Sequence, residues 1–133
     1  MRRRLVSRRS LLTATAGTAA LAGCVGGGEC RSVFDGTERV AAGEMRVYDA
    51  EVAAGQRLYL QFRRLDGPAA AVGVFDGADE PVFRRQDVDR LEEIIEVDEP
   101  GRYAVVTRNE SNADSGQWKL LVAVYRGWCT DVF

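Results

Sequence analysis

Short segments of alternating or continuous apolar residues, separated by turn residues, dominate the chain from residue 31 onward. The segments are rich in β-branched and aromatic residues, and Gly, Pro, Asn and Asp cluster between them, as at 66–68 and 112–116. Strands of about six residues with a turn about every ten predict an all-β fold, an antiparallel β-sandwich or jelly roll of about seven to eight strands. The strands are predicted at residues 47–52, 57–63, 69–75, 91–97, 102–108 and 117–126.

Two of these strands differ in how they alternate. Residues 118–125 are apolar at nearly every position, which predicts a central strand covered on both sides. Residues 57–63 alternate between apolar and polar positions, which predicts one buried and one exposed face. We interpret the exposed face as an interaction face, because an aromatic residue flanked by arginines is enriched at interfaces; the alternative is that the tyrosine packs against a neighbouring strand. This face consists of Arg57, Tyr59, Gln61 and Arg63.

The segment at 84–93 is ambiguous, because Arg84 to Glu93 has the composition of a helical turn as well as of a strand.

The first 23 residues have a different pattern. Arginines, including Arg8 and Arg9, precede a short run of Leu, Ala and Thr that ends at Leu21-Ala22-Gly23-Cys24. The run is shorter than the roughly 20 residues that a membrane-spanning helix needs. The pattern resembles a twin-arginine export signal joined to a lipobox, which implies that residues 1–23 are removed and that Cys24 carries a lipid anchor on the outer face of the cell membrane. A secretory signal in which Cys24 is incidental, or an uncleaved anchor helix, remain the alternatives.

Residues 24–29 then form a lipidated cysteine and a Gly-rich tether, and residues 30–133 are long enough for one sandwich domain. Cys30 and Cys129 lie near the two ends of that domain, and an oxidising exterior favours a disulfide between them. A free buried thiol and an intermolecular bridge are the alternatives.

Charge adds two expectations. The first 23 residues hold five of the 18 Lys and Arg residues and none of the 20 Asp and Glu residues, which leaves a net charge of −7 on residues 24–133. That sign argues against nucleic acid as a partner. Lys119 is the only lysine. An acidic, lysine-poor chain behind such a signal resembles the surface lipoproteins of haloarchaea, and in molar salt the acidic surface acts for solubility rather than for steering.

The order of strands and turns also resembles that of a known type of domain. Residues 51–60, 72–77, 99–106 and 118–122 carry a pattern that resembles the pre-peptidase C-terminal type of β-sandwich domain, and the resemblance covers residues 45–126. It implies that fold. In that family the domain usually accompanies an exported enzyme and is often not catalytic itself.

Few residues carry catalytic chemistry. The chain has no histidine and no glycine-rich phosphate loop, so we expect no enzyme activity, no cofactor and no metal site. The acidic clusters at 76–80 and 87–93 are read as solvated loop charge rather than calcium ligands. Asn109-Glu110-Ser111 is a glycosylation sequon that we expect to be exposed in a hairpin between the last two strands. The expected role is a binding or structural module with a surface protein or polysaccharide as partner; the alternative is an accessory or inhibitory subunit of an exported hydrolase.

Overall fold

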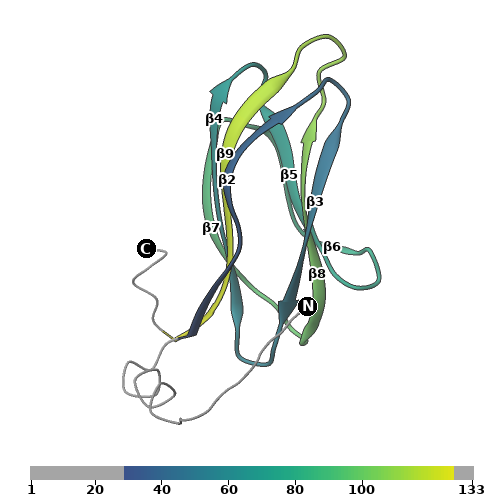
Figure 1. Ribbon diagram of the computed structural model, residues 1–133. Coiled ribbons are helices and arrows are strands. Elements are labelled where there is room, and N and C mark those ends of the chain that lie inside the picture. The colour runs from purple at the N-terminus through teal and green to yellow at the C-terminus, as the bar shows by residue number, and fades with distance from the viewer. Residues whose placement is uncertain (1–28, 128–133) are drawn as a thin grey trace.

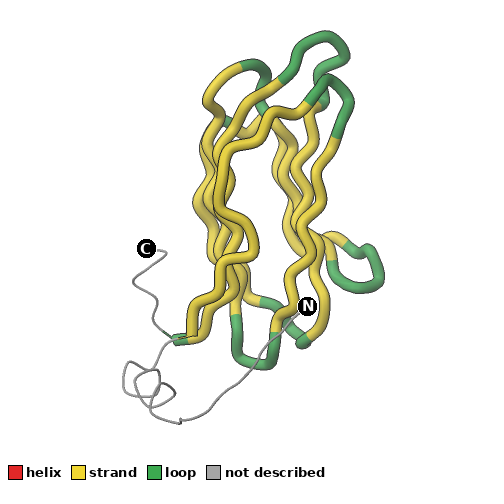
Figure 2. The backbone as a smooth tube through the Cα atoms, viewed as in Figure 1, coloured by secondary structure: helices red, strands yellow, loops and turns green. Residues whose placement is uncertain are grey.

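The structure, a computed structural model, describes residues 29–127 and consists of β-strands joined by loops (Figure 2). No helix occurs among these residues, so this part of the chain contains no helix that could span a membrane. The prediction of an all-β fold with seven to eight strands is confirmed. The strands in this part of the chain are β2 (Glu29–Val40), β3 (Met45–Val52), β4 (Arg57–Asp66), β5 (Ala70–Phe75), β6 (Pro81–Val88), β7 (Arg90–Glu96), β8 (Gly101–Asn109) and β9 (Gly116–Arg126).

The strands form two antiparallel four-stranded sheets that pack face to face as a sandwich (Figure 1). The strand order is β2-β9-β4-β7 in one sheet and β3-β8-β5-β6 in the other. Only β5 and β6 are consecutive neighbours in a sheet, because every other connection passes from one sheet to the other. The strand at 116–126 is central, as predicted, since β9 pairs with both β2 and β4.

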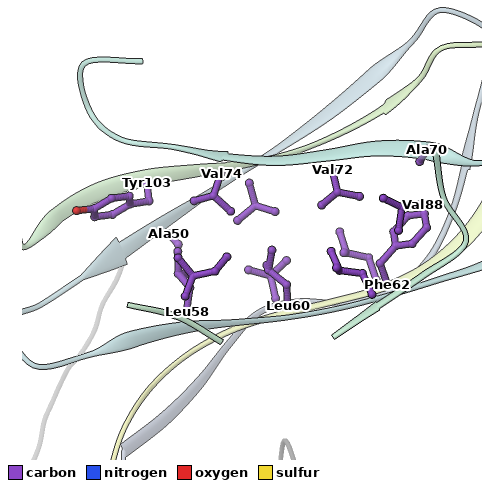
Figure 3. Close-up of a cluster of buried hydrophobic side chains, with 14 of the residues drawn as sticks. Ala50, Leu58, Leu60, Phe62, Ala70, Val72, Val74, Val88 and Tyr103 are labelled. Atoms are coloured by element: carbon purple, nitrogen blue, oxygen red, sulfur yellow. The ribbon is translucent and has the colours of Figure 1, made fainter. Parts of the chain in front are cut away.

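The core lies between the two sheets and follows the alternation that the sequence shows. Leu58, Leu60 and Phe62 of β4 are fully buried and face Val72 and Val74 of β5 across the interior (Figure 3). The ring of Phe62 also lies against Trp118, with 5.4 Å between the ring centroids. Alternate side chains of a strand point to opposite faces, so burying these residues turns the polar positions of β4 outward.

At the edges of the sheets the structure decides one point that the sequence left open and adds one strand that was not predicted. Residues 84–93 form no helical turn but belong to β6 and β7, which are edge strands of different sheets with Asp89 between them. The strand that was not predicted is β2, an edge strand of its sheet, and Cys30 lies within it rather than before the first strand. Edge strands are exposed to water over much of their surface and need few apolar residues, so their sequence signal is weak.

Several predicted positions lie outside the described residues: the export arginines Arg8 and Arg9, the lipidation site Cys24, and Cys129. The segmentation into residues 1–23, 24–29 and 30–133 therefore stays a prediction. Cys30 is in register with Tyr125, four residues before Cys129 in the sequence. The pairing places Cys30 beside the last part of β9, and the Cys30–Cys129 disulfide stays a prediction.

Candidate functional site

The predicted interaction face on β4 is only partly exposed. Arg57, Gln61 and Arg63 are exposed, but Tyr59 is 2% exposed and packs with Ala123 and Tyr125 of β9. The expectation that Tyr59 is available to a partner is therefore wrong, and the alternative that it packs against a neighbouring strand is correct. The physical reason is that small and aromatic residues of β9 and β4 cover one another on the outer face of this sheet.

The hydroxyl of Tyr59 has a polar partner at the edge of this small cluster. It donates a hydrogen bond to the carboxylate of Glu92 on β7. Burial raises the pKa of Tyr59 to about 12, and the hydrogen bond to Glu92 acts in the same direction. Tyr59 therefore stays neutral at physiological pH and holds one oxygen of Glu92 in place.

A row of three cations crosses the same outer face next to this cluster. Arg63 of β4 lies directly opposite Lys119 of β9 on one side and Arg90 of β7 on the other. The three side chains border a shallow depression in the face of the sheet. Its lining includes Asp35, Gln61, Arg63, Arg90, Glu92, Lys119 and Leu121.

The outer face of the other sheet carries an apolar groove. Ala71 and Gly73 of β5 leave its floor low, because one has only a methyl group and the other has no side chain. Met45 at 54% exposure and its neighbour Val47 at 50% are among the most exposed large apolar side chains in residues 29–127. The groove is lined by Met45, Ala71, Val72, Gly73, Phe75, Arg84, Gln86, Val106, Arg108 and Glu110.

Asn109 does not form the exposed sequon that was expected. It lies at the end of β8, and the segment after it crosses to the other sheet instead of forming a hairpin. Its side chain is 0% exposed. The amide nitrogen donates to the carbonyl oxygens of Val40 and Asp114, each at 2.9 Å, and the amide oxygen accepts from the backbone N–H of Ser111 at 3.0 Å. The expectation of an accessible glycan acceptor is therefore wrong, since the acceptor nitrogen is buried and already bonded.

The acidic loop at 76–80 stabilises its own turn. The Asp76 carboxylate accepts hydrogen bonds from the backbone N–H groups of Ala78 at 2.8 Å and Glu80 at 2.9 Å. A carboxylate that bonds to backbone N–H groups in this way shapes a turn. In the part of the chain that the structure describes, no three acidic or cysteine side chains gather as a metal site would need.

Sequence reasoning found Arg63 and Gln61 but missed Lys119 and Arg90 as their neighbours, as well as the apolar groove. The cation row depends on the register between three strands that are far apart in the sequence. The only available signal was that Lys119 is the single lysine in a polar position of an otherwise apolar strand.

No protein-family model matches the sequence, and no curated protein matches it. Two solved structures are similar. One is PliG of Aeromonas hydrophila, a periplasmic lysozyme inhibitor of g-type lysozyme, with 13% identity, a TM-score of 0.54, and coverage of 71% of this chain and 87% of that chain. The other is the pre-peptidase C-terminal domain of collagenase from Bacillus anthracis, with 16% identity, a TM-score of 0.53, and coverage of 67% and 89%. The chain thus shares its β-sandwich fold with both, and the second is of the type that the sequence resembles.

Proposed function

We propose that the protein is a non-catalytic binding module, exported and anchored through a lipid on Cys24 to the outer face of the cell membrane, that docks a partner protein on the β3-β8-β5-β6 sheet. The observation that carries the proposal is the apolar groove on the outer face of that sheet. Met45, 54% exposed, and the half-buried Val106 line it, and Val47, 50% exposed, lies beside it, directly opposite Val106 in the neighbouring strand. Contiguous apolar surface bordered by polar residues is typical of protein interaction sites.

The charges beside the groove indicate the chemistry of the partner. Arg84 and Arg108 both line it, and neither side chain makes a hydrogen bond or ion pair with other residues in 29–127. Methionine and arginine are enriched at interfaces, and an arginine with no internal carboxylate is free to receive one from outside. The partner surface is therefore an apolar segment with carboxylates at its ends.

The anchor is tested separately from the groove. Cys24→Ser is expected to move the protein from the membrane fraction to the medium, since the acyl chains on Cys24 are its anchor. A Cys24→Ser protein that stays with membranes after a salt and carbonate wash would contradict the lipobox interpretation. Replacing Arg8 and Arg9 by lysine is expected to leave uncleaved precursor inside the cell, and unchanged export would indicate the general secretory route.

The groove is tested by crosslinking on intact cells in their native salt. A Met45→Gln, Val47→Gln double variant is expected to lose the crosslinked partner of the wild type. The matched control is Leu65→Gln, Ile94→Gln, whose side chains are equally apolar and 48% exposed but lie outside the groove. If the groove variant keeps its partner, or if the control loses it as well, the docking surface is wrong.

A second candidate, an inhibitory subunit of an exported hydrolase, is supported by the solved lysozyme inhibitor that shares this fold. It predicts that the purified protein lowers the rate of cell-wall hydrolysis by a g-type lysozyme in proportion to its concentration. An unchanged rate at a large molar excess would exclude inhibition of this class of enzyme. Because the readout is hydrolase activity rather than crosslinking, the two candidates are distinguishable.

A further inference from the structure

The cation row on the outer face of the β2-β9-β4-β7 sheet has no function in the fold or in the proposed docking surface. The side chains of Arg63, Arg90 and Lys119 make no hydrogen bond or ion pair with other residues in 29–127. Other arginines of the same sheet are occupied: Arg64 pairs with Asp89 at 2.6 Å, and Arg126 donates to the Ala54 carbonyl oxygen at 2.6 Å.

The register makes this row unfavourable for the isolated domain. Arg63 stands directly opposite a cation in each neighbouring strand, and like charges directly opposite one another in a sheet destabilise it. A purely structural role would favour a carboxylate in the middle position, as in an ordinary cross-strand ion pair. Three adjacent cations without carboxylates between them are instead arranged to share an anionic ligand.

The polar residues that line the depression beside the three cations indicate which class of ligand it can bind. Asp35, Gln61 and Glu92 line it together with the three cations. Carboxylates accept hydrogen bonds from hydroxyl groups, and an amide both donates and accepts, whereas two carboxylates beside the cations repel a compact, highly charged anion such as phosphate. The combination suits a ligand that carries both hydroxyl groups and well-separated negative charges.

The shape of the surface points to an extended ligand. The row runs across three adjacent strands, and strands lie about 4.8 Å apart, so the Cα atoms of the cations span about 10 Å. We propose that this face binds an acidic polysaccharide that crosses the strands. Arg63, Arg90 and Lys119 contact its carboxylate or sulfate groups, and Asp35, Gln61 and Glu92 contact its hydroxyls. Tyr59 supports the site by holding Glu92 through its hydrogen bond.

The test uses the full chain extracted in detergent and titration calorimetry with three probes. Polygalacturonate carries regular carboxylates and hydroxyls, dextran carries hydroxyls alone, and inorganic phosphate carries charge alone. Binding of polygalacturonate but not of dextran is expected, with no displacement by phosphate. Absence of polygalacturonate binding, equal binding of dextran, or displacement by phosphate would each overturn the proposal.

Variants assign the binding to the row. Arg63→Gln and Lys119→Gln are each expected to weaken polygalacturonate binding about tenfold, the loss of one charge-assisted contact. Lys119→Arg is expected to retain the affinity. Arg102→Gln is the matched control, because Arg102 is an exposed arginine of β8 on the opposite sheet and lines neither the cation row nor the groove. Equal loss in Arg102→Gln would show that net charge and not the row carries the binding.

A stability measurement separates lost binding from lost folding. Arg63→Gln removes two like-charge contacts, so its thermal unfolding midpoint is expected to equal or exceed that of the wild type. A lower midpoint would contradict the argument that the row is unfavourable for the fold. Since this site lies on the other sheet, its failure leaves the groove proposal untouched, and failure of the groove leaves this one untouched.

Discussion

Asn109→Ala is expected to destabilise the domain strongly although it removes only a small polar side chain. The Asn109 amide, at the end of β8, joins two other parts of the chain: the end of β2 through the Val40 carbonyl, and the loop before β9 through Asp114 and Ser111. All three hydrogen bonds vanish in the alanine variant. A hydrogen bond contributes about 1 kcal/mol net, so the free energy of unfolding should fall by about 3 kcal/mol.

That loss is a large part of the roughly 5–15 kcal/mol that stabilises a typical domain. Urea unfolding followed by tryptophan fluorescence measures it, since Trp118 is fully buried. Asn112→Ala is the matched control: Asn112 is in the same loop but exposed, and it should change the free energy by less than about 0.5 kcal/mol. If the two variants are equally stable, the bridging role of Asn109 is refuted. A glycan on Asn109 in the native protein would refute it as well, because the glycan would replace a bonded, buried hydrogen.

Three further outcomes are expected. Burial raises the pKa of Glu38 above its usual 4.5, so the folded state binds this proton more tightly than the unfolded state and stability falls as pH rises through the raised pKa. Glu38→Gln keeps an oxygen for the Trp118 indole N–H and should be more stable than the wild type at neutral pH but not below about pH 4. Urea unfolding at several pH values measures this difference, and identical pH profiles of the two proteins would contradict the prediction. Tyr59→Phe should lower stability by about 1 kcal/mol at neutral pH and remove the part of the tyrosinate absorbance that Tyr59 contributes near pH 12. A Tyr59 that ionises near pH 10 would show that it is neither buried nor bonded to Glu92. A Cys30–Cys129 disulfide should raise the intact mass by two hydrogens on reduction, and two alkylatable thiols before reduction would exclude it.

The sequence predicted some strands and their buried positions correctly and others poorly. In β4 the alternation of apolar and polar residues identified the core residues correctly, because a strand with one buried face must alternate. In β9 the continuous apolar run identified the central strand. In β2 and β6 the sequence was a poor guide, since a sheet edge is stabilised by backbone pairing and needs few apolar side chains.

The candidate sites show where the sequence stops being sufficient. The sequence by itself determined the strand class and the inward positions of β4, and it predicts an export and lipidation signal in residues 1–24. Only the tertiary structure decided that Tyr59 is covered by β9, that Asn109 is buried, and that Arg63 meets Lys119 and Arg90. The physical reason is that strand alternation is local, whereas what lies across a strand depends on which strands pair and in which register. In this sandwich nearly all paired strands are distant in sequence, so those neighbours exist only in the folded chain.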